Sequence, residues 1–298
     1  SPFHCDVTPY LNADGTNVLA VRLENLPSSS RWYPGAGLYR NVHLICTSPK
    51  AHIPVWGTFV TTPFVSEDLA SVSLDITVES DLDNVGIEYI TDIFSPDGNK
   101  VASRRSVSLY HKGDKHIQKF SVDSPKLWSP EHPHLYKALT RIVVGGKVTD
   151  EYETRFGIRS IEFIPEKGFY LNGVHRKFKG VCNHHDLGPL GAAISVPALR
   201  HQLDLLKNMG CDAVRTSHNI PAPELVSLCD EMGFMVMVEP FDEWNDAKCQ
   251  NGYHRFFDEW AERDMMNMLH SFRNSPAVVM WSIGNEVPSQ CSPTGYKT

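Results

Sequence analysis

The sequence predicts two fold classes in series: an all-β antiparallel sandwich, followed by part of an α/β barrel. Two observations carry this prediction. Up to about residue 164, apolar and polar residues alternate in short runs, which is the period of half-buried strands. After Phe169, short apolar runs alternate with segments of helical period, which is typical of parallel strands joined by right-handed crossovers.

Length and composition set the limits of the prediction. The 298 residues allow about two or three domains, and a content of 41% hydrophobic and 21% charged residues excludes disordered, collagen-like and coiled-coil chains. The net charge of −7 offers nothing to neutralise a phosphate backbone, so nucleic acid is not an expected partner. Seven Cys without a CxxC pair indicate neither a disulfide framework nor a zinc site.

Membrane and targeting signals are not visible in the printed sequence. No apolar run approaches the roughly 18 residues of a membrane helix, and no secretory pattern stands at Ser1. We therefore expect no membrane partner. The compartment stays open between cytoplasm and periplasm.

The sandwich is predicted over residues 49–158. Alternation is clear in residues 69–80, where Val72 and Leu74 fall on one face. Turn signals separate the runs, as at Gly145-Gly146. Strands spaced this way favour an antiparallel sandwich.

Residues 1–48 also alternate, most clearly from Val18 to Glu24, and are therefore predicted to contain strands. The segment is too short for a second sandwich. We interpret it as the C-terminal strands of a truncated domain.

The barrel portion is predicted over residues 159–298. Its sequence alternates short apolar strands with helices, and polar residues follow each strand. Side chains at the carboxyl ends of barrel strands form the active site in such folds. A doubly wound sheet is the alternative, but no GxGxxG phosphate turn is present. The expected strands are 178–181, 213–215, 235–238 and 278–281, and the expected helices are 195–209, 223–232 and 254–272.

Glu286 is the sharpest candidate for chemistry. It follows an apolar strand, a Trp and a Gly-Asn pair in residues 281–286. A carboxyl group at a strand end is well placed to donate a proton. The alternative is an ordinary helix-start or surface carboxylate.

Histidines after the first strand admit two interpretations. His184, His185 and Asp186 are metal-ligand types, but adjacent residues of a strand point to opposite faces, so both histidines cannot easily bind one ion. Hydrogen bonding to a polar ligand, or packing under a loop, is the alternative that we favour. His218, beside Asn219, carries the same ambiguity between a ligand-binding and a structural residue.

Arg215 lies within a predicted strand and needs a carboxylate partner inside the barrel mouth. Glu239, Asp242 and Glu243 follow the next strand. They form either an acidic cation site or a solvated loop, and we favour the solvated loop.

Six segments in order resemble glycoside hydrolase family 2, the β-galactosidase, β-glucuronidase and β-mannosidase group. The resemblance covers nearly the whole chain. It implies a jelly-roll end before residue 49, an immunoglobulin-like sandwich and the first half of a (β/α)8 TIM barrel. The segments are RWYPGAGLYR at 31–40, LWSPE at 127–131, RFGIR at 155–159, FYLNG to KGV at 169–181, RTSHN at 215–219 and WSIGNE at 281–286.

The resemblance implies a role for each matching residue. Glu286 is implied to be the general acid/base, and Asn285 to bind the sugar near its 2-hydroxyl. His184 and His218 match histidines of the sugar site, Arg215 matches an arginine near the nucleophile, and the loop of Asp186 is expected to face the same pocket.

A magnesium site of some β-galactosidases is not carried over. That site uses a Glu and a nearby His, whereas Glu243 here is followed by Trp244 and Asn245. We therefore expect neither a metal nor a cofactor.

The retaining mechanism of this family needs a second carboxylate about 5–5.5 Å from the first. No Asp or Glu follows Glu286, and residues 159–298 allow at most four strand–helix units. We expect an internal fragment that lacks the nucleophile and is inactive alone.

Three hypotheses follow. The first is a fragment of a retaining exo-β-glycosidase that acts on a β-galactoside, with β-glucuronidase or β-mannosidase as alternatives. The second is a non-catalytic carbohydrate-binding or scaffold module, and the third is a metal-dependent barrel hydrolase. The open edges of half a barrel also raise the hypothesis of a homo-oligomer.

Overall fold

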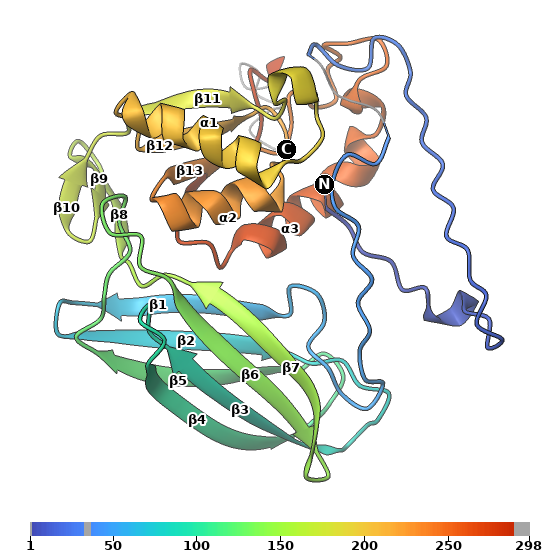
Figure 1. The fold of residues 1–298 in the computed structure, drawn as a ribbon, viewed down its shortest axis with the longest axis vertical. Coiled ribbons are helices and arrows are strands. Elements are labelled where there is room, and N and C mark those ends of the chain that lie inside the picture. Colours follow the sequence, from blue (N-terminus) through green and yellow to red (C-terminus); the bar gives the residue numbers. More distant parts are fainter. Residues whose placement is uncertain (1, 33–36, 289–298) are drawn as a thin grey trace.

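The computed structural model describes residues 2–32 and 37–288 (Figure 1). It contains an antiparallel β-sandwich, a small three-stranded sheet and a four-stranded parallel sheet with helices. The predicted fold class is confirmed: the sandwich comes first in the chain and the α/β portion follows it. The domain boundaries proposed from the sequence stay predictions.

Two antiparallel sheets form the sandwich, in the lower part of Figure 1. The residues that alternate in the sequence face the space between the sheets, where Val72, Leu74 and Ile76 are at most 1% exposed. One sheet has the order β1-β2-β5, from β1 (Thr58–Val65), β2 (Leu69–Thr77) and β5 (Lys115–Asp123). The other has the order β4-β3-β6-β7, from β3 (Gly86–Phe94), β4 (Lys100–Leu109), β6 (Tyr136–Val144) and β7 (Lys147–Phe156).

The hairpin between β6 and β7 turns at Gly145 and Gly146, as the sequence predicts. Both residues have positive φ, +58° and +75°. That backbone matches the twist of an antiparallel pair, and glycine adopts it without a steric cost.

The α/β portion is the upper part of Figure 1 and is called the half barrel. Its strands run parallel in the order β11-β12-β13-β14. The expected elements are present within a few residues of their predicted bounds. The strands are β11 (Gly180–His184), β12 (Ala213–Ser217), β13 (Met235–Val238) and β14 (Val278–Trp281), and the helices are α1 (Val196–Asn208), α2 (Pro223–Met232) and α3 (Phe257–Phe272).

Three helices pack against this sheet because each has one apolar stripe. Leu203 of α1, Leu225 of α2 and Met268 of α3 share one buried cluster with Val214 and Val236 of the sheet. A small antiparallel sheet precedes the half barrel. It consists of β8 (Ile161–Ile164), β9 (Gly168–Leu171) and β10 (Val174–Arg176).

The sandwich and the half barrel meet at a packed junction. Trp128, from the loop after β5, is fully buried in the apolar cluster of the half barrel, and its Nε1 donates to the Asp230 carbonyl at 2.9 Å. Arg159 donates from Nε to the Pro276 carbonyl and from Nη2 to the Val278 carbonyl, at 2.6 and 2.8 Å. These contacts seat the sheet of the half barrel on the sandwich.

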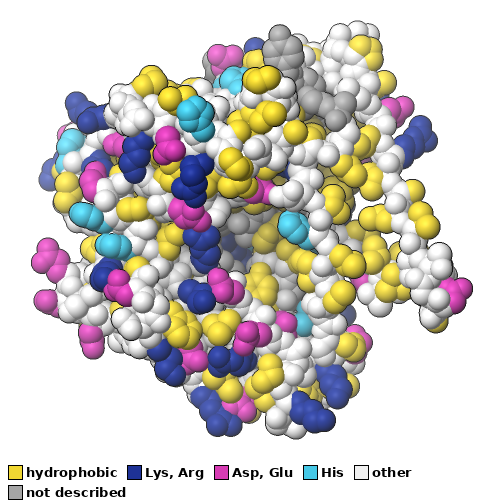
Figure 2. All heavy atoms as spheres, in the orientation of Figure 1, with side chains coloured by type: hydrophobic (Ala, Val, Ile, Leu, Met, Phe, Trp, Pro, Cys, Tyr) yellow, Lys and Arg dark blue, Asp and Glu magenta, His cyan; other side chains and the backbone are white. Residues whose placement is uncertain are grey.

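The first segment of the chain departs from the prediction. No strand is found among the described residues before Thr58; only an isolated bridge pairs His52 with Glu79. Val18 is 89% exposed and Leu19 is 72% exposed, and apolar side chains lie along the surface of this segment (Figure 2). The structure shows no strand from Val18 to Glu24, because a strand needs a neighbour to complete its backbone hydrogen bonds. That residues 1–48 end a truncated domain stays a prediction.

Parts of two predicted features lie outside the described residues. They are residues 33–36 of the 31–40 motif and residues 289–298 of the tail. None of the described helices is long and apolar enough to cross a membrane.

Candidate active site

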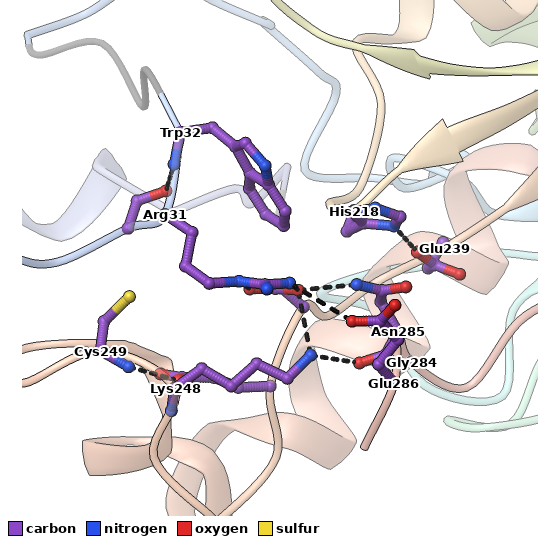
Figure 3. Close-up of polar contacts among 12 residues, drawn as sticks. Arg31, Trp32, His218, Glu239, Lys248, Cys249, Gly284, Asn285 and Glu286 are labelled. Carbon is purple, nitrogen blue, oxygen red and sulfur yellow. Dashed lines mark hydrogen bonds and ion pairs between the residues drawn. The ribbon is translucent and has the colours of Figure 1, made fainter. Parts of the chain in front are cut away.

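The carboxyl ends of the four parallel strands bring the predicted site residues to one edge of the sheet. His184 ends β11, His218 follows β12, Glu239 follows β13, and Asn285 and Glu286 follow β14. Parallel strands place these ends together, so the polar residues after each strand become neighbours. Figure 3 shows the resulting network.

Glu239 is the centre of this network, although its side chain is 0% exposed. Its Oε2 accepts hydrogen bonds from Arg215 Nε at 2.9 Å, Arg215 Nη2 at 2.7 Å and Ser282 Oγ at 2.7 Å. Its Oε1 lies 2.5 Å from His218 Nδ1. The prediction of a solvated loop is wrong for Glu239, because cationic and polar partners compensate the loss of water around the carboxylate.

The buried carboxylate also orients the imidazole of His218. Because Nδ1 faces Glu239, the other ring nitrogen, Nε2, is directed away from the carboxylate. The ring of His184 lies 5.3 Å from the ring of His218, and burial together with the neighbouring His218 lowers the pKa of His184. The indole of Trp32 covers both rings, at centroid distances of 4.8 and 5.0 Å.

Asn285 is 4% exposed, and its amide is bound at both ends. Its Oδ1 accepts from Arg215 Nη2 at 2.9 Å, and its Nδ2 donates to Asp242 Oδ1 at 2.9 Å. These two partners fix which way the amide faces, because a reversed amide would set donor against donor and acceptor against acceptor. The amide nitrogen has a second N–H, for which no partner is found among the described residues.

Glu286 has a 74% exposed side chain, in contrast to the buried residues beside it. Its backbone is left-handed, with φ +45°. Gly284, two residues before Glu286, is closely packed, since a Cβ there would lie 2.7 Å from Trp244 Nε1. Trp244 Nε1 in turn donates to the Ile283 carbonyl at 2.9 Å. The loop therefore holds the Glu286 carboxyl open to a ligand.

Asp242 links the strand ends to the first segment of the chain. Its carboxylate accepts two hydrogen bonds from Arg31, at 3.0 Å from Nε and 2.7 Å from Nη2, and lies 3.3 Å from Lys248 Nζ. Burial alone would raise the pKa of Asp242, but the hydrogen bonds from Arg31 and Asn285 and the charge of Lys248 hold it below its ordinary value. This residue too is paired rather than solvated.

Glu243 has a separate set of partners. It is 4% exposed and accepts backbone N–H bonds from Lys248, Cys249 and His254, at 2.6, 3.3 and 2.9 Å. Burial would raise its pKa, but these bonds lower it. The solvated-loop prediction is therefore wrong for all three acidic residues. Among the described residues, no group of three or more His, Cys, Asp or Glu side chains is placed to hold a metal ion.

The remaining predicted residues lie at the margin. Asp186 follows β11, and its Oδ1 accepts from the Gly188 N–H at 3.3 Å. His185 stacks on Tyr39, with ring centroids 6.2 Å apart, whereas His184 contacts Trp32 and His218, so the two adjacent histidines have different partners.

Four members of the network were not singled out from the sequence: Arg31, Trp32, Lys248 and Ser282. Arg31 and Trp32 belong to the 31–40 motif, which indicates the family but assigns no role to either residue. Their distance along the chain, 211 positions from Arg31 to Asp242, gives no local signal of contact. Lys248 lies six positions after Asp242 in the sequence, and a lysine so close to an acidic run indicates an ion pair.

The fold and the site define a class of protein in which a β-sandwich is followed in the chain by a barrel portion, with ionisable groups at the carboxyl ends of the barrel strands. A model of glycosyl hydrolases family 2 matches residues 51–159, and a model of the TIM barrel domain of that family matches residues 163–296. The first match covers the sandwich and the second covers the half barrel. The chain belongs to glycosyl hydrolase family 2.

Relatives and solved structures of this family match the chain over nearly its whole length. It is 45% identical over 294 residues to a β-galactosidase, BoGH2A, of Bacteroides ovatus, which covers 97% of this chain and 34% of the relative. It is 38% identical over 292 residues to a putative β-glucuronidase of Formosa agariphila, which covers 98% of this chain and 28% of the relative. The crystal structure of a β-glycosidase from Bacteroides vulgatus superposes with a TM-score of 0.85 at 37% identity, over 91% of this chain and 34% of that chain. The chain thus spans about a third of the length of these relatives.

Proposed function

We propose that this chain supplies the acid/base and sugar-binding part of a retaining exo-β-glycosidase site, with a terminal β-galactoside as the first candidate substrate. One observation carries the proposal. The exposed Glu286 carboxyl stands beside the network of Asn285, Arg215, Glu239 and His218 at one sheet edge. The relative of 45% identity, a β-galactosidase, supports the choice of sugar.

Glu286 is the proposed general acid/base. As an acid it protonates the glycosidic oxygen that leaves, and as a base it then deprotonates the incoming water. Such a group must reach substrate and water, which agrees with its 74% exposed side chain. Asn285 would donate its second amide N–H to the hydroxyl next to the anomeric carbon. Its hydrogen bonds to Arg215 and Asp242 already fix the orientation of this amide.

The rings beside this carboxyl are the proposed sugar-binding surface. The C–H face of a sugar packs on aromatic rings such as Trp32, and ring nitrogens of His184 and His218 hydrogen-bond hydroxyl groups. Asp186 is proposed to contribute at the outer margin of the same pocket. The partner proposed for this chain is therefore a carbohydrate.

The nucleophile is proposed to come from sequence outside these 298 residues. Retaining chemistry needs a second carboxylate that is free to attack the anomeric carbon. Glu239 and Asp242 are the nearby acids, but their oxygens are engaged by Arg215, His218 and Arg31. The relatives are about three times as long as this chain, which leaves room for the second half of a barrel.

Activity should be measured on the complete protein from the reading frame that contains this chain. Nitrophenyl β-galactoside, β-glucuronide and β-mannoside would identify the sugar. The 298 residues alone should not turn over any of them. Turnover by this chain that is lost in Glu286→Gln would contradict the proposed division of the site.

The role of Glu286 has a specific signature. Glu286→Gln should remove turnover of a phenyl glycoside but leave the first bond-breaking step of a dinitrophenyl glycoside, whose leaving group needs no protonation. Added azide should then restore the second step, because azide attacks without a general base. A variant that loses both substrates equally, with no azide rescue, would exclude the acid/base role.

A carbohydrate-binding module without catalysis remains the second candidate function. Its favouring observation is that the ring surface and the bound amide are complete within this chain. Binding of a non-hydrolysable thio-β-galactoside to the 298-residue chain should be lost in His218→Ala and Asn285→Ala. Binding that survives both changes would place the sugar away from these rings and this amide, and would contradict a binding site built from them.

A further inference from the structure

Residues 27–32 and 37–41, called the N-terminal strap, lie against the carboxyl edge of the half barrel (Figure 1). The strap makes hydrogen bonds as well as the ring contacts of Trp32 and Tyr39. Arg40 donates to the Ile220 and Pro221 carbonyls at 2.8 and 3.2 Å, and Asn251 Nδ2 donates to the Pro27 carbonyl at 2.8 Å. The strap thus brings Arg31 to the strand ends from a distant part of the chain.

Arg31 is bound to Asp242 in a geometry that only a guanidinium provides. Its Nε and Nη2 donate in parallel to the two carboxylate oxygens, at 3.0 and 2.7 Å. The same Asp242 Oδ1 accepts from Asn285 Nδ2 at 2.9 Å (Figure 3). Arg31 therefore acts on Asn285 through one shared carboxylate, without a direct bond between them.

The main chain of Asn285 is held as well as its amide. Lys248 Nζ, which also faces Asp242, donates to the Asn285 carbonyl at 2.7 Å, and the Asn285 N–H donates to the Phe241 carbonyl at 2.9 Å. The next residue is Glu286, whose left-handed φ of +45° is costly for a residue with a Cβ. Such a backbone persists where its surroundings determine it fully, and the contacts on Asn285 provide that.

We propose that Arg31 is a positioning residue for the acid/base loop: it fixes Asp242, and through Asp242 it orients Asn285 and the backbone that carries Glu286. This inference rests on the proposed function of Glu286. Arg31 acts from the strap, and its Nη2 lies 3.9 Å from the Glu286 carboxylate, which it flanks without a close hydrogen bond. A lysine cannot replace it because one ammonium does not bind both oxygens of Asp242 in parallel.

Kinetics of the complete protein provide the first test. Arg31→Met should lower kcat on its nitrophenyl glycoside by about 10–100-fold, with KM changed by less than about threefold, since a small misplacement of a reacting group costs rate rather than binding. Arg31→Lys should not restore kcat. Arg22→Met is the matched control, because Arg22 is exposed and forms no ion pair with any described residue; it should leave kcat unchanged.

A double-mutant cycle tests the path through Asp242. Asp242→Asn should reproduce the loss in Arg31→Met, and the double variant should be no slower than Asp242→Asn alone. Multiplied losses in the double variant would show independent roles and overturn the proposal. A raised KM with unchanged kcat for Arg31→Met would instead make Arg31 a sugar ligand, and would equally overturn it.

A second readout does not depend on glycosidase activity. In the 298-residue chain, the side-chain amide of Asn285 should give separate NMR signals for its two protons, with slow solvent exchange. Arg31→Met should average the signals and accelerate exchange at least tenfold, whereas Arg22→Met should not. If the complete protein hydrolyses no glycoside but the amide responds, the proposed function fails and the positioning role stands. If activity is present and the amide does not respond, the positioning role fails.

Discussion

Two long-range contact regions hold the half barrel in different ways. The junction with the sandwich is made of apolar packing around Trp128, which is fully buried, and of bonds from Arg159 to backbone carbonyls. The N-terminal strap is held by hydrogen bonds from the exposed Arg31 and the part-buried Arg40, and by the ring of Trp32. Buried apolar contacts contribute most to stability, whereas exposed polar contacts contribute little. We infer that the junction determines whether the half barrel folds, and that the strap determines how well its edge is aligned.

The largest loss of stability should come from removing the buried side chain at the junction. Trp128→Ala removes a fully buried indole and its bond to the Asp230 carbonyl, which should lower the free energy of unfolding by about 3–5 kcal/mol. Urea unfolding followed by circular dichroism measures this. Trp260→Ala is the control, since Trp260 is 37% exposed and lies outside the apolar cluster of the half barrel, and it should cost clearly less than Trp128→Ala. Equal losses in both variants would remove the distinction between junction and surface.

Removing the Glu239 carboxylate at the centre of the site should cause the next largest loss of stability. Glu239→Ala leaves Arg215 and His218 without their shared partner, at a cost of about 2–3 kcal/mol, reduced from that of a fully buried pair because the side chain of Arg215 is 29% exposed. Glu239→Gln keeps the shape and should cost less. Unfolding midpoints of the two variants measure the difference. An alanine variant as stable as the wild type would mean that the network is not held by charge.

The sequence predicts the strands of the sandwich better than the structure of the first segment. The alternation in β2 predicts a buried strand correctly, because its partners β1 and β5 are close in the same sandwich. The same alternation from Val18 to Glu24 fails, because periodicity reports which side chains are apolar but not whether a neighbouring strand exists. A local pattern therefore predicts an element only when a partner is also present.

The candidate site follows the same rule. His184, Arg215, His218, Asn285 and Glu286 are predicted to meet because parallel strands share one carboxyl edge. The prediction of a solvated loop fails for the acidic run after β13, since polar residues in a loop resemble a solvated surface unless their cationic partners are known. Arg31 supplies one of those cations from 211 positions away, and no spacing rule reaches that far.

The stability of the junction should fall as pH rises, because it contains the buried carboxyl group of Asp230. Burial at the junction raises the pKa of Asp230 from 3.8 to about 7, while Ser275 Oγ and the Ala277 N–H still donate to its Oδ1. Because the folded pKa lies above the unfolded one, the stability from this group is present below pH 4 and is lost as pH rises to about 7. The loss is on the order of 4 kcal/mol, and it levels off above pH 8.

Asp230→Asn keeps the acceptor but cannot ionise. The stability of the wild type relative to this variant should therefore fall between pH 4 and pH 8, in urea unfolding measured at each pH. Asp123→Asn, at an exposed strand end, is the control and should show no such slope. A relative stability that rises with pH would mean that Asp230 is ionised in the folded protein and stabilised by the charge of Arg159.

The smallest loss of stability should come from a change in the strap, which separates the strap from the junction. Arg31→Met removes a bond pair whose arginine is 36% exposed, so the free energy of unfolding should fall by less than about 1 kcal/mol. The same variant is expected to lower kcat of the complete protein by 10-fold or more, because the strap aligns Asn285 and Glu286 rather than supporting the core. Stability and rate measured side by side on Arg31→Met and Trp128→Ala would test the division directly. If Arg31→Met lost stability and rate in the same proportion as Trp128→Ala, alignment and folding would be one property of the half barrel, and the strap would be a structural element like the junction.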